Sequence, residues 1–387
     1  MKLLWIPIGL LPIAASHAGL MPLREHVDLH WHYDPVDAWV CEARTGQAGQ
    51  DVMHELSEVY LPIGDEAVED GGERYSQPDL GEFAFTGVAA GEPIWISPQI
   101  QEPGQVWPGF NNDQTAENFG SYQETDPRLP AEDRAMSQPW IQIRFHGLSY
   151  LGTGEPAFSM WKTDGFGTPT PWFSTAAGQN TFIYVAGSHV HANWGFGALG
   201  IYRIRMSASA YQGPGQTSPT GESDIFTVTF AVGLVAQWQA DHFTGAELED
   251  AAVSGLAADP DGDGLTNLQE FAFGMDPRDG QRMASLAGLG LPKHSLRREA
   301  GGWQERFEYP RRKALGQLKP LRYQPEISVN LSDAGWAMPA DVLESVHEIS
   351  GDAAHLAEQW EWVELQRTLP AGPPERRFWR LGVTQDP

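Results

Sequence analysis

The apolar residues of this chain fall into short stretches, rich in β-branched and aromatic side chains, that lie between frequent glycines and prolines. The sequence has 42 Gly and 29 Pro distributed along 387 residues. Several stretches alternate apolar and polar residues, which is the pattern of strands with one face toward solvent. Because long helical segments between these strands are missing, the sequence predicts a mainly β protein built on an antiparallel β-sandwich rather than a parallel sheet. The clearest such stretches are 140–145, 181–185, 201–206 and 225–232.

The composition changes near Trp238. Helix formers predict one helical segment within 238–254 and a second helix at 268–273 that ends at Gly274 or before Pro277. Strand-like stretches return at 323–331 and 376–381. The polar, turn-rich segments 64–81 and 102–133 are expected to be long loops. The expected parts are a signal peptide (1–18), a β-sandwich domain (19–236), a short helical connector with a calcium loop (237–281) and a small β-rich C-terminal domain (282–387).

The N-terminus has the pattern of a secretory signal peptide. Lys2 precedes an apolar run that ends at Ala15, and this run is too short for a good membrane span. Small residues favour cleavage after Ala18, and cleavage after Ser16 is the alternative, which would make His17 the new N-terminus. We therefore expect an exported protein in the periplasm, at the cell surface or outside the cell, with no membrane span in the mature protein.

Charge and cysteine content limit the partners. The formal net charge of −26 repels nucleic acid and anionic lipid and favours cations, so we expect no nucleic-acid partner. Cys41 is the only cysteine in the sequence, so no disulfide can form within the chain. A buried, unreactive thiol is the expected state of Cys41. Core packing and bound ions must then provide the stability.

An acidic loop follows the first helical segment. Oxygen-bearing side chains occupy positions 1, 3, 5, 9 and 12 of a twelve-residue loop, position 7 offers a backbone carbonyl, and Gly264 at position 6 permits a sharp turn. This spacing wraps a Ca²⁺ ion, and without a cation so negative a loop would repel itself. A solvated acidic turn is the alternative. The expected calcium ligands are Asp259, Asp261, Asp263, the Leu265 carbonyl, Asn267 and Glu270.

Two histidine clusters lie about 160 residues apart. Side chains two residues apart on a strand point to the same face, so each cluster would line one side of its strand. If the two strands lie together, imidazoles and a carboxylate converge as in a zinc or copper site. Histidines held by ordinary hydrogen bonds are the alternative. The expected ligands are His26, Asp28, His189 and His191, with His30 and His32 as weaker candidates and Asn193 as a hydrogen-bond partner behind the ligands.

Four segments resemble, in order, the surface-anchored domain called choice-of-anchor M, which also occurs as a repeat in actinobacterial wall proteins. The resemblance covers 20–235 and is most specific in the Gly-x-His-x-His-x-Asn-Trp-x-Phe segment. It implies metal capture or hand-over beside a surface metal-uptake system, with His26, Asp28, His189, His191 and Asn193 as the matching positions. The segments are 25–28, 91–99, 187–196 and 200–202.

A second resemblance concerns 238–277, which is similar to a linker of exported Gram-negative proteins and to dockerin and thrombospondin-type loops; it implies calcium. The C-terminal end shows no anchor pattern, so wall attachment is not expected.

Three functions follow from these observations. The favoured one is an exported, non-catalytic protein that captures or holds zinc or copper and carries a structural calcium ion. The second is a copper- or zinc-dependent extracellular enzyme acting on polysaccharide. His17 at the mature N-terminus would then clasp copper, or three ligands would leave an open position on zinc. The third is a carbohydrate- or matrix-binding module, suggested by 15 Trp. No His-Glu-x-x-His or Gly-x-Ser-x-Gly motif occurs in the sequence.

Overall fold

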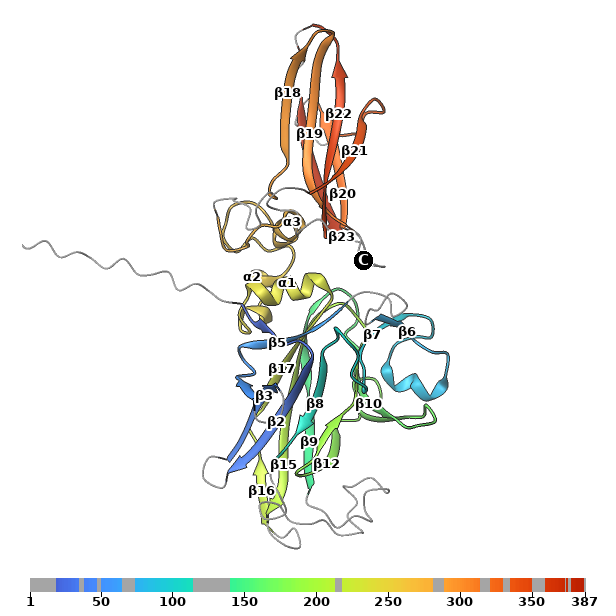
Figure 1. The fold of residues 1–387 in the computed structure, drawn as a ribbon, viewed down its shortest axis with the longest axis vertical. Helices are drawn as coiled ribbons and strands as arrows, with labels where there is room; N and C mark the ends of the chain where they lie inside the picture. The colour runs from blue at the N-terminus through green and yellow to red at the C-terminus, as the bar shows by residue number, and fades with distance from the viewer. Residues whose placement is uncertain are drawn as a thin grey trace, which may run out of the picture.

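The computed structural model shows a mostly β protein with several sheets. The expected signal peptide, residues 1–18, lies outside the described residues. In Figure 1, the N-terminal strands form the larger part at the bottom of the view and the C-terminal strands form the part at the top. The helices lie between these two parts. The described residues are 19–34, 38–46, 50–64, 74–113, 140–212, 218–280, 289–313, 321–329, 335–349, 359–372, 374 and 377–385.

The N-terminal part contains three sheets. The first runs in the order β1 (Met21–Pro22), β5 (Val59–Ile63), β17 (Phe226–Val232), β15 (Gly200–Gln212), β9 (Trp140–Gly152) and β12 (Thr181–Val185), with β16 (Ser218–Glu222) paired to β15. The second runs β11 (Pro169–Ser174), β10 (Phe158–Thr163), β14 (Asn193–Phe196), β7 (Pro93–Ser97) and β6 (Arg74–Ser76). The third runs β13 (His189–His191), β8 (Trp107–Asn111), β2 (His26–Asp34), β3 (Ala38–Thr45) and β4 (Val52–His54).

One hydrophobic core joins the three sheets. Trp31 of β2, Trp194 of β14 and Phe230 of β17 are all fully buried members of it. The rings of Trp194 and Phe110 stack with centroids 5.5 Å apart, which ties the second sheet to β8 of the third. Burying side chains of this size supplies most of the stabilisation of a chain that has no disulfide.

Strand pairing is only partly antiparallel. β1 with β5, β17 with β5, and β2 with β8 are parallel pairs. The expected antiparallel pairing is found between the other paired strands but not at these three places. Parallel strands need a long connection, and here the connection from β2 to β8 contains other strands rather than a single helix. The alternation within each strand carries no information on this choice of partner.

Two expected loops contain regular structure. β6 and the 3₁₀-helix η2 (Gly81–Thr86) lie in or at the end of the segment 64–81, and β8 lies inside 102–133. The prediction of loops was wrong at these positions. Pro108 and Gly109 interrupt the apolar pattern of β8, which is why the sequence did not indicate a strand there. Phe110 of this strand is nevertheless fully buried.

The helical segment carries α1 (Leu234–His242), the 3₁₀-helix η4 (Glu247–Glu249), α2 (Ala251–Ser254) and α3 (Asn267–Phe273). A Thr266–Gln269 capping box begins α3, and Gly274 in the left-handed conformation ends it, as the sequence predicted. Trp238 of α1 and Phe271 of α3 share a second hydrophobic cluster with Tyr60 and Ile201 of the first sheet. None of the helices in the described part of the chain is long and apolar enough to span a membrane.

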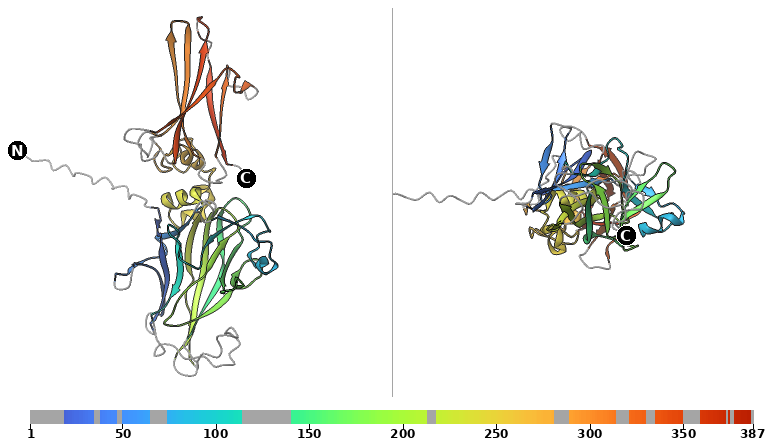
Figure 2. Two further views of the ribbon diagram at one scale, coloured as in Figure 1. Left: turned by 45° about the vertical axis from the view of Figure 1, so that its right-hand side comes forward. Right: turned by 90° about the horizontal axis from the view of Figure 1, so that it is seen from below.

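The C-terminal part is formed by two further sheets, visible at one end of the molecule in both side views (Figures 1 and 2). One runs in the order β18 (Lys293–Glu299), β19 (Gly302–Arg312), β22 (Trp360–Leu369) and β21 (Leu343–Glu348). The other pairs β20 (Leu321–Ser328) with β23 (Phe378–Gln385). Phe307 of β19 stacks on Trp379 of β23 with centroids 4.7 Å apart, so the two sheets share a small core.

Cys41 provides a direct test of the packing of the third sheet. Its thiol is buried in the core, and burial raises its pKa well above the usual value. We expect a thiol reagent to leave Cys41 of the native protein unlabelled and to label one equivalent after unfolding in urea. Labelling of the native protein at the rate of the unfolded chain would contradict the packing of β3.

Candidate metal centre

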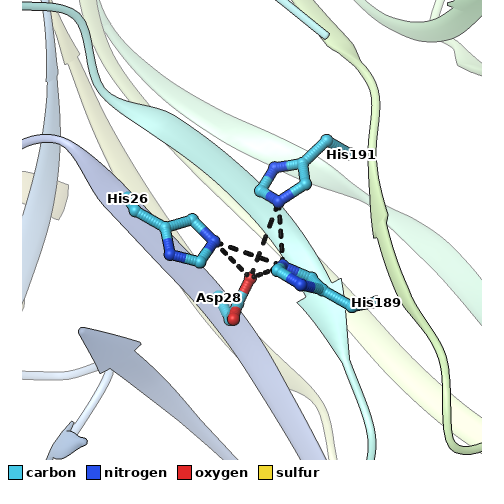
Figure 3. A group of neighbouring side chains, drawn as sticks. All are labelled: His26, Asp28, His189 and His191. Carbon is cyan, nitrogen blue, oxygen red and sulfur yellow. Dashed lines mark hydrogen bonds and ion pairs between the residues drawn. The ribbon is translucent and has the colours of Figure 1, made fainter. Parts of the chain in front are cut away.

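Three neighbouring strands place the two histidine clusters together. β8 lies between β2 and β13 in one sheet, pairing parallel with β2 and antiparallel with β13. Gly109 of β8 is the register partner of both Asp28 and His191, so these two residues lie in one row across the sheet. Figure 3 shows His26 and Asp28 on one side of the β8 ribbon and the two histidines of β13 on the other.

The alternation of β2 explains which face carries the ligands. Val27, Leu29 and Trp31 are fully buried in the core. Residues of the other parity, His26 and Asp28 among them, therefore point to the opposite face. The prediction that the histidines of each strand share one side is confirmed for the strand β2 by this burial pattern.

Four donor atoms converge on one point (Figure 3). The Nε2 atom of His189 lies 2.7 Å from Asp28 Oδ1, 2.8 Å from His191 Nε2 and 3.2 Å from His26 Nε2. Asp28 Oδ1 lies 3.3 Å from His26 Nε2 and 4.0 Å from His191 Nε2. A tetrahedral ion with bonds of about 2.0–2.1 Å holds its ligand atoms about 3.3–3.4 Å apart. The five separations scatter around that value.

The ring nitrogens of this group can share few hydrogen atoms. His191 Nδ1 lies 3.1 Å from the Pro108 carbonyl, so it carries the hydrogen that it donates there, and Nε2 of neutral His191 presents a lone pair. His189 Nε2 carries at most one hydrogen, yet Asp28 Oδ1, His191 Nε2 and His26 Nε2 all lie at hydrogen-bond distance from it. One cation accepting all four lone pairs satisfies every atom at once.

Burial and charge prepare these groups for a cation. Burial, together with the neighbouring His189, lowers the pKa of His191 to about 4. Burial by itself would raise the pKa of Asp28, but hydrogen bonds from His189 and His26 outweigh it and keep the pKa well below its usual range. At neutral pH the Asp28 carboxylate is therefore ionised and the His191 imidazole neutral, which are the forms that ligate metal.

An arginine holds the second oxygen of Asp28. Arg44 is the register partner of Asp28 on β3, and its Nη2 donates to Asp28 Oδ2 at 3.2 Å. Its Nη1 donates to Asp113 Oδ2 at 3.2 Å, and His30 Nε2 lies 3.2 Å from the same oxygen. The hydrogen bond from Arg44 Nη2 orients the Asp28 carboxylate so that Oδ1 is the oxygen that lies beside the histidines.

Trp107 and Gly109 complete the site, and sequence reasoning missed both. The Trp107 ring stacks on His191 with centroids 3.5 Å apart and an interplanar angle of 7°, and its Nε1 donates to the Gln99 carbonyl at 3.0 Å. A Cβ on Gly109 would lie 2.6 Å from His191 Cε1, so only glycine leaves room for that ring. Trp107 and Gly109 are two residues apart and so share one face of a strand, which is a pattern that could have indicated them. They lie inside the segment 102–133, which was expected to be a loop.

The weaker candidates lie elsewhere. His30 is buried against Asp113 and does not join the group of four, and His32 is exposed with its ring stacked on that of His30. Asn193 begins β14, in a different sheet from His191, because the chain crosses between sheets at the fully buried Ala192.

The expected role of Asn193 beside the ligands was wrong. Its Oδ1 accepts from the Gln99 amide at 2.9 Å, and its Nδ2 donates to Thr163 Oγ1 at 3.1 Å. Nδ2 also lies 3.4 Å from the Trp161 carbonyl, to which it donates. Within the described residues, the Asn193 side chain makes no hydrogen bond to a histidine.

The acidic loop forms a second group of possible ligands. Carboxylate oxygens of Asp259, Asp261 and Asp263 lie within 4.8 Å of one another. Asp259 accepts from the amides of Gly262 and Gly264 at 2.9 Å each, and both glycines have positive φ, so the sharp turn expected at Gly264 is confirmed.

The remaining predicted calcium ligands lie around this loop. Asn267, at the start of α3, is buried and donates from Nδ2 to the carbonyls of Val253 and Gly255. Glu270, also on α3, is fully buried. Leu265 donates its amide to Asp263 Oδ1 at 2.7 Å. The six residues are therefore held in one loop and the helix that follows it.

Comparison with known protein families and with curated proteins found no match to this chain. The resemblance to the choice-of-anchor M domain therefore stays a prediction, and the geometry of the site carries the functional argument.

Replacing Gly109 by Ala should disturb the histidine site while leaving the fold intact. The added methyl group displaces the His191 ring, and we expect zinc affinity to fall at least about tenfold, as for loss of other groups that orient a ligand. Isothermal titration with zinc measures this, with Gly81→Ala as the control, because a Cβ there meets no atom within 4 Å. Equal zinc affinity for both variants would contradict the stated packing.

Glu270 should make stability depend on pH when divalent ions are removed. Burial, together with the negative charges of the nearby aspartates, raises its pKa to about 8; these aspartates are Asp261, Asp263, Asp276 and Asp259. Because the pKa of Glu270 is higher in the folded state, this group contributes stability to the fold at pH values below its unfolded pKa of about 4.5. That contribution is lost as the pH rises through the folded-state pKa of about 8. We expect Glu270→Gln to remove that decline, measured by urea unfolding in chelator at about pH 5 and about pH 8.5. An unchanged decline in the variant would assign it to other groups.

Proposed function

We propose that this protein binds one transition-metal ion, zinc or copper, through His26, Asp28, His189 and His191, and holds it without catalysing a reaction. The observation that supports this most strongly is the convergence of three Nε2 atoms and one carboxylate oxygen at separations close to those of a tetrahedral ion. Imidazole suits zinc and copper, and the mixed set of nitrogen and oxygen donors is common to both.

The number of donors favours holding over catalysis. Structural zinc sites use four protein ligands, whereas catalytic sites use three and leave a position open for water or substrate. Here four side chains supply four donors, and Arg44 holds the Asp28 carboxylate with Oδ1 toward the histidines. The same count argues against the polysaccharide-cleaving enzyme, whose expected His17 ligand lies outside the described residues.

The ion would still be reachable from solvent. The His189 side chain is 39% exposed and that of His26 is 28% exposed, while Asp28 is buried. A site with one buried ligand, Asp28, and two partly exposed ligands, His26 and His189, suits capture and release of an ion. We therefore propose that the protein is exported and works in the periplasm, at the cell surface or outside the cell, with a surface metal-uptake system or an extracellular polysaccharide as its partner.

The finer architecture is part of this proposal. We propose that the first sheet and the two five-stranded sheets form the two layers of a β-sandwich, because side chains from all three share one core. The helices α1 to α3 would connect this sandwich to the small C-terminal β domain. Such an arrangement places β2, β8 and β13 in one layer, with their histidine-bearing face outward.

Replacing His189 and His191 together by Ala should abolish stoichiometric zinc and copper binding. The variant loses two of four donors, and the remaining two cannot hold an ion at micromolar concentration. Metal content of the purified mature protein by mass spectrometry, with titration by zinc and copper, measures the loss. His32→Ala is the matched control, since His32 is exposed on β2 outside the group. Full metal stoichiometry in the double variant would show that the ligands are elsewhere.

A further inference from the structure

Glu270 is a buried acid without partners. It is fully buried on α3, and within the described residues neither of its carboxylate oxygens has a hydrogen-bond partner. Protonation would not satisfy it, because a neutral carboxylic acid still carries a donor and an acceptor that need partners. Leaving such a group unmatched destabilises the folded state, and a buried charge does so more than a neutral polar group. A ligand for these oxygens would remove that cost.

Two further buried oxygens of the same loop and helix lack a hydrogen-bond partner among the residues that the structure describes. Asp261 Oδ2 and Asn267 Oδ1 are buried without a hydrogen-bond partner in the described part of the chain. The charges that act on Glu270 include those of Asp259, Asp261 and Asp263, all of them acidic. A set of hard oxygen donors with no nitrogen or sulfur among them suits calcium rather than zinc or copper.

We infer that the loop 259–270 holds a calcium ion, and that this ion fixes α3 as the joint between the N-terminal sheets and the C-terminal strands. The inference concerns a different site from the histidine centre and does not depend on the function proposed for it. Glu270 at the end of the loop supplies the ligand that lies on the helix itself, so the ion ties loop and helix together.

On one side, α3 is attached to the N-terminal part. Asn267 Nδ2 donates to the carbonyls of Val253 and Gly255 in and after α2, at 3.0 Å and 2.8 Å. The Phe271 ring packs edge-on against Trp238 of α1 with centroids 5.7 Å apart, inside the cluster that includes Tyr60 of the first sheet. These contacts fix the first turn of α3 against α2 and its apolar face against α1.

On the other side, the last three carbonyls of α3 accept hydrogen bonds from the C-terminal part. Arg312 Nε donates to the Phe271 carbonyl at 2.9 Å, Tyr323 Oη to the Ala272 carbonyl at 3.0 Å and the Gly290 amide to the Phe273 carbonyl at 3.2 Å. Such carbonyls have no partner within a helix, and a positive charge beside them is favourable. The C-terminal strands therefore dock on the end of this helix.

The helix is too short to provide this surface unaided. Isolated helices below about 12–15 residues are marginal in water, and α3 has 7 residues. Without a cation, repulsion among the carboxylates of Asp259, Asp261 and Asp263 opposes the folded loop, and Glu270 adds to it where it is ionised. Loss of the ion should therefore loosen α3, and with it the hydrogen bonds from Arg312 and Tyr323.

Calcium titration and hydrogen exchange of the full chain test this inference. We expect one calcium equivalent to bind. In calcium relative to EGTA, exchange of the α3 amides and of Gly290 should slow at least about tenfold, because opening of the joint becomes rarer. Absence of calcium binding would overturn the site. Binding with unchanged exchange of α3 and Gly290 would overturn the joint while keeping the site.

Two variants separate these outcomes further. Glu270→Gln removes the buried charge, so the protein should fold, lose most calcium affinity and retain zinc binding at the histidine centre. Tyr323→Phe removes the hydroxyl that bridges the Arg312 amide and the Ala272 carbonyl. It should bind calcium normally but show less calcium-dependent protection in β19 and β20. The exposed Asp79→Asn is the control and should match the wild type. Unaltered calcium affinity in Glu270→Gln would contradict the assignment.

Discussion

The pairing of β8 with both β2 and β13 is the constraint on which the histidine site depends. The two clusters are distant in sequence, and no local interaction brings them together. β8 pairs with one strand on each of its two edges. Its Gly109 lies in register with Asp28 and His191, and because it has no side chain the His191 ring can lie over it. The parallel pairing with β2 sets which residues share a row. A shift of one residue on any of these strands would turn its ligands into the core.

The surroundings of the site hold its ligands in the forms that bind metal. The Pro108 carbonyl fixes the tautomer of His191, Trp107 holds its ring, and Arg44 orients the Asp28 carboxylate. The positive charge of Arg44 opposes a nearby cation, whereas its hydrogen bond reduces the freedom of Asp28. Asp113 offsets part of that charge at 3.2 Å.

The sequence allowed several parts of this structure to be predicted. The parity of His26 and Asp28 on a strand, the boundaries of α3 and the turn at Gly264 follow from local rules of alternation, capping and glycine conformation, and the structure agrees with them. The mostly β character follows from the same local patterns. Whether the four ligands bind an ion stays a prediction.

What could not be predicted depends on contacts between distant segments. β8 is recognisable only by its partners, because Pro108 and Gly109 remove its apolar alternation. The choice of parallel pairing for β2 and β8 has no signature in either strand. Asn193 has the parity of the histidines, yet Ala192 directs the chain into another sheet, so parity no longer implies a common face. Arg44 and Asp113 acquire a role only once β3 lies beside β2.

Anomalous diffraction from a crystal of the zinc-loaded protein tests the central claim most directly. The account predicts one strong peak within about 2.0–2.2 Å of the Nε2 atoms of His26, His189 and His191 and of Asp28 Oδ1, with no fifth ligand. A zinc-loaded crystal with no peak among these four atoms would contradict it.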